Sequence, residues 1–272
     1  LYADRLSINI ELPTVQGLHQ LAPEKDSATI HGAMGQLHSH ISTSKEERRA
    51  AAKTSVISLP LSRSTKAAKP KAFAPGGQST QMIVGADAAD DGDIILTSAK
   101  LYTGYGLRRV YYSAFSPIPD SSQELPLIAP PLVREHRLYQ ADWLMRFYGF
   151  EAQEIVPVGQ QGQRMLSLEH DPKLAWALAH RERFPVNLNT APRELLLRVP
   201  GLGVQSVHKL VAARRWRMLH RNDLNQLKLP LRKILPFVEC VGWSPGRSLD
   251  DPLLAAKLVQ PMAPQPQQAS LF

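Results

Sequence analysis

The stretch from Asn187 to Arg215, NLNTAPRELLLRVPGLGVQSVHKLVAARR, constrains the fold of this chain more than any other. It predicts a short helix, a tight glycine turn and a second helix. The turn is Pro200–Gly203, because proline and glycine both disfavour a helix interior. The second helix carries apolar side chains at helical spacing, namely Val204, Val207, Leu210 and Val211. We expect this face to pack on Leu195 and Leu196 of the first helix.

The turn is expected to form a phosphate-binding cradle made of backbone groups. Thr190 is predicted to cap the first helix, and Pro192 fits its first turn. Gly201 and Gly203 let a ligand approach the main chain closely, and the second helix begins with N–H groups that suit an anion. The side facing away from the valines carries polar and basic residues, namely Arg193, Gln205, Ser206, Lys209 and Arg214.

Positive charge is concentrated in two regions. The 272 residues carry a net charge of +8, and residues 181–221 alone hold nine Lys or Arg against two Glu, which is +7. Residues 43–75 hold eight Lys or Arg against two Glu, which is a further +6, and are predicted to form a mobile basic loop. The remainder is net −5. The distribution therefore favours a polyanionic partner over a general gain in solubility.

The hairpin stretch resembles the helix-hairpin-helix of DNA repair proteins, whose core is a PGhG sequence matched here by Pro200–Gly203. The resemblance implies that duplex DNA is bound without sequence preference, because backbone amides and basic side chains contact phosphates. The residues expected to contact DNA are Arg193, Pro200, Gly201, Leu202, Gly203, Val204, Gln205, Lys209 and Arg214. The alternative is an αα-hairpin whose glycine turn serves packing alone.

The residues before the hairpin alternate between strand and helix patterns. Strands are predicted at Arg5–Leu12, Gln81–Ala86 and Leu107–Phe115, and helices after Ser27, from about Asp91 and at Leu132–Phe147. The helix after Ser27 has the apolar stripe Ile30, Met34, Leu37 and Ile41. This alternation implies parallel strands joined by right-handed crossovers, so we expect part of an α/β sheet or barrel.

A second, degenerate hairpin without glycines is predicted after the first. Asn222–Leu224 begins its first helix, and Lys228–Pro230 turns into Leu231–Phe237. The single cysteine, Cys240, is expected to be a buried thiol; it excludes a disulfide framework or a cysteine metal site and favours a reduced, cytoplasmic compartment. The sequence contains no apolar run long enough to span a membrane.

Four segments, residues 2–14, 76–86, 108–119 and 134–150, together resemble the C-terminal half of a radical S-adenosylmethionine (SAM) protein. The most similar family known to us is the DNA modification and repair radical SAM family, whose members end in a helix-hairpin-helix domain. The resemblance covers residues 1 to about 242. It implies that polar residues near the ends of barrel strands hold S-adenosylmethionine. The matching positions are Asn9, Glu11, Gln78, Ser79, Thr80, Gln81, Val84 and Gly85.

The chain departs from this family in one respect. The family holds a [4Fe–4S] cluster with three cysteines in a CxxxCxxC loop, and this sequence has only Cys240. We therefore expect the chain to be inactive alone and interpret it as the C-terminal portion of such an enzyme; no catalytic residue is identified. The alternatives are a non-enzymatic DNA-binding module with an α/β scaffold, and an RNA or protein interaction module.

The resulting fold prediction is the C-terminal portion of a partial (β/α) radical SAM barrel followed by an all-α helix-hairpin-helix domain. Four parts are expected: the partial barrel (1–125), a helical connector (126–185), the DNA-binding domain (186–242) and an extended tail (243–272).

The last residues suggest a further partner. Gln268-Ala269-Ser270-Leu271-Phe272 resembles the QLSLF-type peptide by which bacterial DNA-processing proteins dock on the replication sliding clamp, with Ala269 in place of the usual Leu. The expected clamp contacts are a polar one from Gln268 and apolar anchors from Leu271 and Phe272. The preceding Pro261–Gln268 has the composition of an extended linker.

We predict that a labelled peptide of residues 261–272 binds sliding clamp in a fluorescence anisotropy titration. A peptide with Leu271→Ala and Phe272→Ala should lose this binding, because paired apolar anchors supply most of the energy of such contacts. Indistinguishable curves for the two peptides would contradict the clamp prediction.

Overall fold

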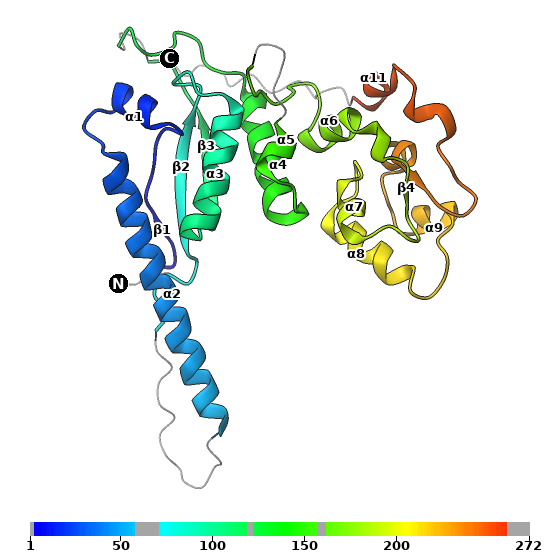
Figure 1. Ribbon diagram of the computed structural model, residues 1–272, viewed down its shortest axis with the longest axis horizontal. Helices are drawn as coiled ribbons and strands as arrows, with labels where there is room; N and C mark the ends of the chain where they lie inside the picture. Colours follow the sequence, from blue (N-terminus) through cyan, green and yellow to red (C-terminus); the bar gives the residue numbers. More distant parts are fainter. Residues whose placement is uncertain (1–2, 58–70, 119–121, 157–161, 260–272) are drawn as a thin grey trace, which may run out of the picture. The chain divides into compact units, whose positions relative to one another are not determined.

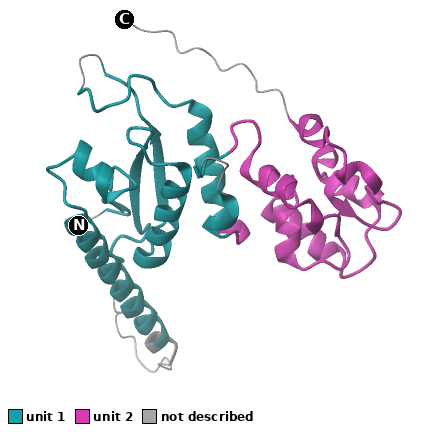
Figure 2. Ribbon diagram, turned by 45° about the horizontal axis from the view of Figure 1, so that its top comes forward, with its two compact units in different colours: residues 1–145, 151–166 teal, residues 146–150, 167–272 magenta. Residues whose placement is uncertain are grey.

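The structure, a computed structural model, describes residues 3–57, 71–118, 122–156 and 162–259. The chain forms two compact units (Figure 2): unit 1 comprises residues 1–145 and 151–166, and unit 2 comprises residues 146–150 and 167–272. The predicted mixed α/β class is confirmed, and the described residues form no closed barrel. Across the same residues, no helix is both long and apolar enough to cross a bilayer.

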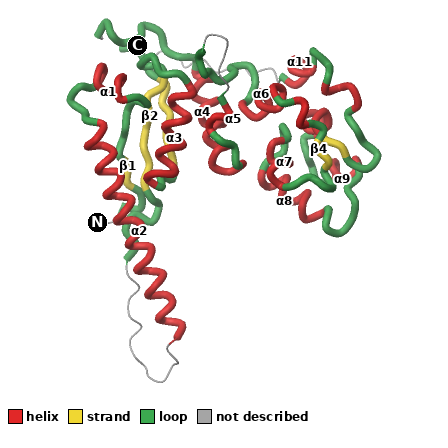
Figure 3. Tube along the Cα trace, viewed as in Figure 1, coloured by secondary structure: helices red, strands yellow, loops and turns green. Residues whose placement is uncertain are grey.

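Unit 1 is built on a parallel sheet. Its elements are β1 (Leu6–Ser7), α1 (Val15–Leu21), α2 (Ser27–Ile57), β2 (Gln78–Val84), α3 (Asp91–Tyr105), β3 (Arg109–Ala114), most of α4 (Leu132–Tyr148) and α5 (Ala152–Ile155). The strands pair in the order β1-β2-β3 (Figure 3), which confirms the predicted parallel pairing. β1 is shorter than predicted, since the chain rejoins β2 only at a bridge between Glu11 and Met82, where Glu11 has a φ of 63°.

The core of unit 1 lies between this sheet and its helices. Its fully buried side chains are Met34 of α2, Met82 and Val84 of β2, Ile94, Ile95 and Leu101 of α3, Val110 of β3 and Leu138 of α4. The predicted stripe on α2 is confirmed, with Met34 and Ile41 buried and Ile30 and Leu37 half-buried. Alternation in β2 and helical spacing in α3 therefore deliver apolar side chains to one core.

The prediction of a mobile basic loop at 43–75 is wrong for its first part. α2 continues without a break to Ile57 (Figure 1), and residues 58–70 lie outside the described part of the chain. The helix persists because residues 45–53, KEERRAAAK, are all strong helix formers and no proline occurs before Pro60. Every one of these nine residues is exposed. The basic region is thus partly an ordered, solvated helix.

Unit 2 contains two helical hairpins and a short parallel strand pair. Its elements are α6 (Pro172–Ala179), η1 (Arg181–Arg183), β4 (Val186–Asn187), α7 (Arg193–Arg198), α8 (Val204–Ala213), α9 (Arg221–Gln226), α10 (Leu231–Ile234), η2 (Leu235–Phe237), β5 (Val238–Glu239), η3 (Gly246–Leu249) and α11 (Leu254–Leu258). β4 pairs with β5, joining the segment before the first hairpin to the segment after the second. The predicted order of helix, glycine turn and helix is confirmed for α7 and α8.

The second hairpin repeats the path of the first with different residues. Its turn places Lys228 at a φ of 54°, buries Leu229 and uses Pro230 as the N-cap of α10. In the first hairpin the corresponding steps are made by Gly201, Leu202 and Gly203. α9 begins at Arg221 after the N-cap His220, one residue before the predicted Asn222.

A buried ion pair joins two helices of unit 1. Asp91, the first residue of α3, has a fully buried side chain and accepts a hydrogen bond from Arg134 of α4 at 2.7 Å. Its other oxygen accepts from the backbone N–H of Leu166 at 2.9 Å, and Arg134 also donates to the carbonyl of Ala89. These bonds link the segment after β2 to α4 and to Leu166, which follows α5 in the chain.

We predict that Arg134→Met lowers the free energy of unfolding by about 3 kcal/mol, because it leaves the Asp91 carboxylate buried without its cation. The measurement is urea unfolding followed by circular dichroism. Arg134→Met combined with Asp91→Asn should recover part of the loss, and Lys100→Met, at an exposed position of α3, should change little. A wild-type value for Arg134→Met would show that the pair contributes nothing.

Candidate nucleic-acid interface

The turn between α7 and α8 is tightly held on its inner side. The N–H of Leu202 donates to the carbonyl of Val199 at 3.1 Å, and the Leu202 side chain is buried. Gly201 has a φ of 83°, and a Cβ there would lie 2.9 Å from Cβ of Lys233 and 3.1 Å from Ile234 in α10. Gly201 is therefore required by the close packing of the two hairpins.

Gly203 differs from Gly201 because none of the described residues comes close enough to require a glycine there. Its φ is −85°, and the nearest atom to an added Cβ is the hydroxyl of Tyr148, at an ordinary contact distance of 3.6 Å. Gly203 is the N-cap of α8 and supplies no side chain to bond the first N–H groups of that helix. These donors, which no side chain caps, suit an external anion.

The beginning of α7 differs from the prediction. Thr190 is exposed and does not cap the helix; the N-cap is Pro192, with an extended ψ of 158°, and the helix starts at Arg193. The side chain of Asn187 accepts from the N–H groups of Asn189 and Thr190 instead, at 2.9 and 3.3 Å. Proline also disfavours helical geometry in the residue before it, which delays the start of α7.

Lys173 of α6 supports the turn from inside unit 2. Its ammonium donates to the carbonyl of Leu202 at 2.6 Å and lies 4.7 Å from the centre of the Tyr148 ring. Burial lowers the pKa of Lys173 to about 7, while Asp171 acts in the opposite direction. This lysine therefore fixes the hairpin rather than offering a charge to a ligand.

α8 presents one polar face to solvent. Val207 and Leu210 are buried, while the exposed residues of the helix are Gln205, His208, Lys209 and Ala212. They recur every three or four positions, so they form a single face that begins at the uncapped end of the helix. Of the residues predicted to contact DNA, Gln205 and Lys209 lie on this face. Val204 is half-buried at the first position of α8, and Pro200 is buried in the turn.

The basic residues of this region fall into two groups. Arg214 is half-buried and donates to the carbonyls of Leu188 and Ala191, at 3.2 and 2.6 Å, so it fastens the end of α8 instead of facing outward as predicted. Arg217 pairs with Asp223. By contrast, the exposed residues Arg193, Lys209 and Arg215 make no ion pair with any described residue. Only some of the basic side chains in residues 181–221 are thus unpaired and exposed to a ligand.

The residues proposed to hold S-adenosylmethionine are not gathered into one site. Gln78 lies at the amino end of β2, buried, with its amide donating to the carbonyls of Met34 and Tyr105 at 3.3 and 2.5 Å. Gly85 follows the opposite end of the strand, about 20 Å away at the usual rise per residue. Of the other six positions, Asn9 and Glu11 follow β1, and Ser79, Thr80, Gln81 and Val84 lie in β2.

Each of these six residues either makes a hydrogen bond to a neighbouring residue or occupies a position in β2. The side chains of Asn9 and Glu11 accept from Ser7 and Lys25, both at 2.9 Å. Ser79 and Thr80 are buried in β2, and the Thr80 hydroxyl accepts from the N–H of Ile10 at 3.1 Å. Gln81 and Val84 are later positions of the same strand. This arrangement does not fit a single cofactor pocket, so no reaction step is assigned to unit 1.

The other predicted sites cannot be placed or are not formed by the described residues. Gln268, Leu271 and Phe272 lie outside them. Within 3–57, 71–118, 122–156 and 162–259 there is no group of three or more His, Cys, Asp or Glu that could hold a metal ion. Cys240 is buried, as predicted, and burial raises the pKa of its thiol.

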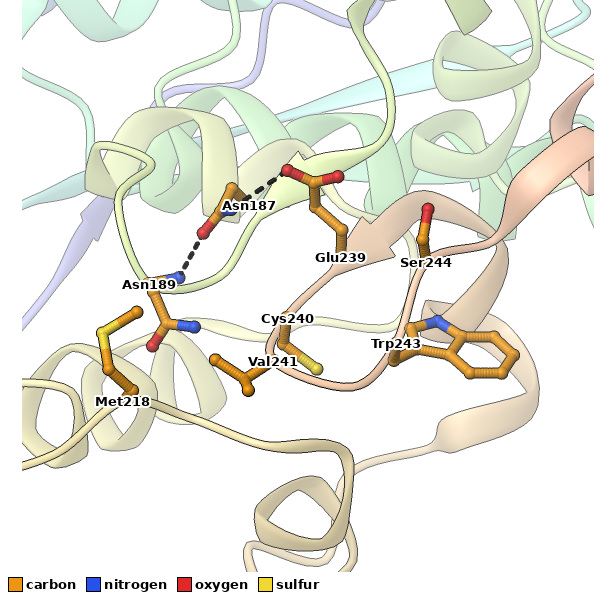
Figure 4. A pocket seen from close by; sticks show the side chains of 8 residues that line it. All are labelled: Asn187, Asn189, Met218, Glu239, Cys240, Val241, Trp243 and Ser244. Carbon is orange, nitrogen blue, oxygen red and sulfur yellow. Dashed lines mark hydrogen bonds between the residues drawn. The ribbon is translucent and has the colours of Figure 1, made fainter.

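A cavity of about 410 Å³ lies beside the β4–β5 pair (Figure 4). It is lined by Asn187, Asn189, Met218, Glu239, Cys240, Val241, Trp243 and Ser244. Its polar groups chiefly maintain the fold: Asn187 donates to Glu239 at 3.0 Å, and the Asn189 amide both donates to and accepts from the backbone of Leu219. No sequence pattern indicated it, because the paired residues of β4 and β5 lie 52 positions apart in the chain and meet only in the folded unit.

The chain matches no protein-family model, no curated protein and no solved structure.

We predict that Lys173→Met changes how stability depends on pH. Because the pKa of Lys173 in the folded protein, about 7, is below its ordinary value of 10.5, the unfolded chain binds the extra proton between these values. The free energy of unfolding should therefore rise with pH over this window, relative to Lys173→Met, by at most about 1.4 kcal/mol per pH unit. Urea titrations from pH 6 to 10 measure it. Exposed Lys209→Met is the control, and parallel curves for wild type and Lys173→Met would refute the prediction.

Proposed function

We propose that the α7–α8 hairpin of unit 2 binds the phosphate backbone of duplex DNA without reading its sequence. The observation that carries the proposal is Gly203. It leaves the first N–H groups of α8 without a side-chain cap, in a place where the fold itself would accept a Cβ. A glycine that internal packing does not require is what a close approach by a ligand would need.

Charge and register support the same assignment. Lys209 lies on the exposed face that begins at Gly203, and Arg193 and Arg215 are exposed cations of the same hairpin. An uncapped helix end attracts anions through its N–H groups and its dipole. Neither feature distinguishes one base from another, so binding should depend on salt rather than on sequence.

A hairpin used only for packing explains less. It accounts for Gly201, whose Cβ would meet α10, but it leaves Gly203 and the free cations without a role. An RNA partner is the other alternative, and competition between DNA and RNA duplexes of equal length distinguishes the two.

The wider proposal is that the chain is the DNA-binding C-terminal portion of a radical SAM enzyme that modifies or repairs DNA. It rests on the resemblance of the four segments in residues 2–150 and on the parallel α/β character of unit 1. Docking of the C-terminal tail on a sliding clamp would keep such a protein near DNA. The S-adenosylmethionine and [4Fe–4S] cluster belong to the complete family protein, and unit 1 gives the chemistry no further support.

The test of DNA binding is fluorescence anisotropy with two blunt duplexes of unrelated sequence. Both should bind equally, and if about four phosphates are neutralised, log affinity should fall with log salt at a slope near −3.6. Gly203→Val should weaken binding by about tenfold or more, since each hydrogen bond to a charged group contributes about 1.5–3 kcal/mol. Lys209→Ala should weaken both duplexes alike and make the slope shallower by about 0.9.

The control is Gly104→Val, which adds the same atoms at another open position, on α3. Circular dichroism confirms that the variants are folded. If folded Gly203→Val binds as tightly as wild type and Gly104→Val, the hairpin does not contact DNA and serves packing alone. Preference for RNA duplex over DNA would favour the RNA alternative.

A further inference from the structure

The segment that follows α8 exposes a large aromatic side chain. Trp216 is 89% exposed and Met218 56%, within the sequence Arg214-Arg215-Trp216-Arg217-Met218. Most tryptophans in folded proteins are largely buried. In the same unit Trp176 is only 4% exposed, so unit 2 has a core that accepts indole. The exposure of Trp216 therefore requires a separate explanation.

The backbone on both sides of Trp216 is fastened. Its own N–H donates to the carbonyl of Ala213 at 3.1 Å, and the preceding Arg214 is tied to the carbonyls of Leu188 and Ala191. After it, Arg217 pairs with Asp223. The N–H of the buried Leu219 also donates to Asn189 at 2.7 Å. Hydrogen bonds thus fix the backbone that carries the indole, which reduces the conformational entropy lost when Trp216 binds a partner.

The position of Trp216 continues the exposed face of α8. Gln205, Lys209 and Ala212 recur on this face, and Trp216 comes four residues after Ala212. α8 ends at Ala213, and the chain continues as a turn in which the N–H groups of Arg215 and Trp216 bond the carbonyls of Ala212 and Ala213 at 3.4 and 3.1 Å.

The surroundings of the indole favour an aromatic, anionic ligand. The exposed Arg215, unpaired among the described residues, precedes it, Arg217 follows it in an ion pair with Asp223, and Lys209 lies on the exposed face of α8. Cations beside an exposed aromatic ring are the combination by which proteins hold unpaired nucleotides, since the ring stacks on a base while the cations meet its phosphate. Bases inside an intact duplex are already stacked on one another. At a blunt end the exposed face belongs to a closed base pair, so an unpaired base is offered to the indole only where pairing is interrupted.

We infer that Trp216 stacks on an unpaired base next to the duplex that the hairpin holds. The preferred ligand of unit 2 is then DNA in which duplex adjoins an unpaired nucleotide, as at a gap, a single-stranded extension or a damaged position. This inference rests on the proposed function of the hairpin, and it adds the class of DNA structure that is selected.

The experiment compares a blunt duplex, the same duplex with a single-stranded extension, and the single strand alone, by fluorescence anisotropy at fixed salt. The full chain is used as wild type, Trp216→Ala, Trp216→Phe and Trp143→Ala, the last removing an exposed tryptophan of unit 1. Wild type should prefer the extended duplex over the blunt one by about tenfold, within the range reported for stacking on one base. Trp216→Ala should lose this preference but keep its affinity for blunt duplex. Trp216→Phe should keep most of the preference, and Trp143→Ala all of it.

A second readout is tryptophan fluorescence, which a stacked base quenches. Quenching by the extended duplex should persist in Trp143→Ala and largely disappear in Trp216→Phe. Persistent quenching in Trp216→Phe would contradict stacking at this position.

The other outcomes separate the two proposals. Equal binding of both duplexes by wild type, or equal losses on both in Trp216→Ala, overturns the stacking inference and leaves hairpin binding intact. Binding of single strand that depends on Trp216, without binding of blunt duplex, overturns the hairpin proposal and with it the selection of a duplex junction, and leaves only stacking of Trp216 on an unpaired base. Binding of none of the three DNAs overturns both. Trp216-dependent binding to anionic lipid vesicles in place of DNA would assign the segment to a membrane surface and also overturn both.

Discussion

The organisation of unit 2 depends on the close approach of its two hairpins at Gly201. With no Cβ at this position, the first turn can lie against Lys233 and Ile234, and Leu202 can enter the core beside Lys173. A larger residue would be opposed both by its positive φ and by the backbone-proximal atoms of α10. This inner contact leaves the start of α8 on the outer side of the turn. The two glycines thus have different roles: Gly201 allows the close packing of the hairpins, and Gly203 leaves the first N–H groups of α8 without a side-chain cap.

The sequence predicted the elements whose patterns are local. Glycines and proline located the turn at Pro200–Gly203, and helical spacing of valines located α8. Alternating strands and helices predicted the parallel sheet. The prediction failed where charge was weighed above helix propensity: residues 45–53 are basic but consist of strong helix formers, and α2 continues through them to Ile57. It also could not reveal partners distant in the chain. Arg214 looks like a surface cation until the carbonyls of Leu188 and Ala191 are seen beside it.

Unit 1 illustrates a further limit of motif matching. A polar residue near a strand suggests a ligand contact, but the direction and register of the strand decide whether it can make one. Gln78 and Gly85 are both among the residues predicted to hold S-adenosylmethionine, but they lie at opposite ends of β2. The polar groups after β2 are instead joined to one another, as Asp91 is to Arg134, and stabilise the connection between helices. The need to pair a buried charge explains why Asp91 and Arg134 occur here.

The unequal turns of the two hairpins have a consequence for orientation. At the position of Gly203 the second hairpin has Pro230, which has no N–H group and carries a ring where the first hairpin is open. Two equivalent turns would let a protein grip both strands alike and sit on a duplex in either direction. If the first turn alone receives phosphate, as we propose, the complex would be polar: the main chain would contact one strand, and the protein would face one way along it. Any group attached to the chain would then be delivered to one side of the contact only.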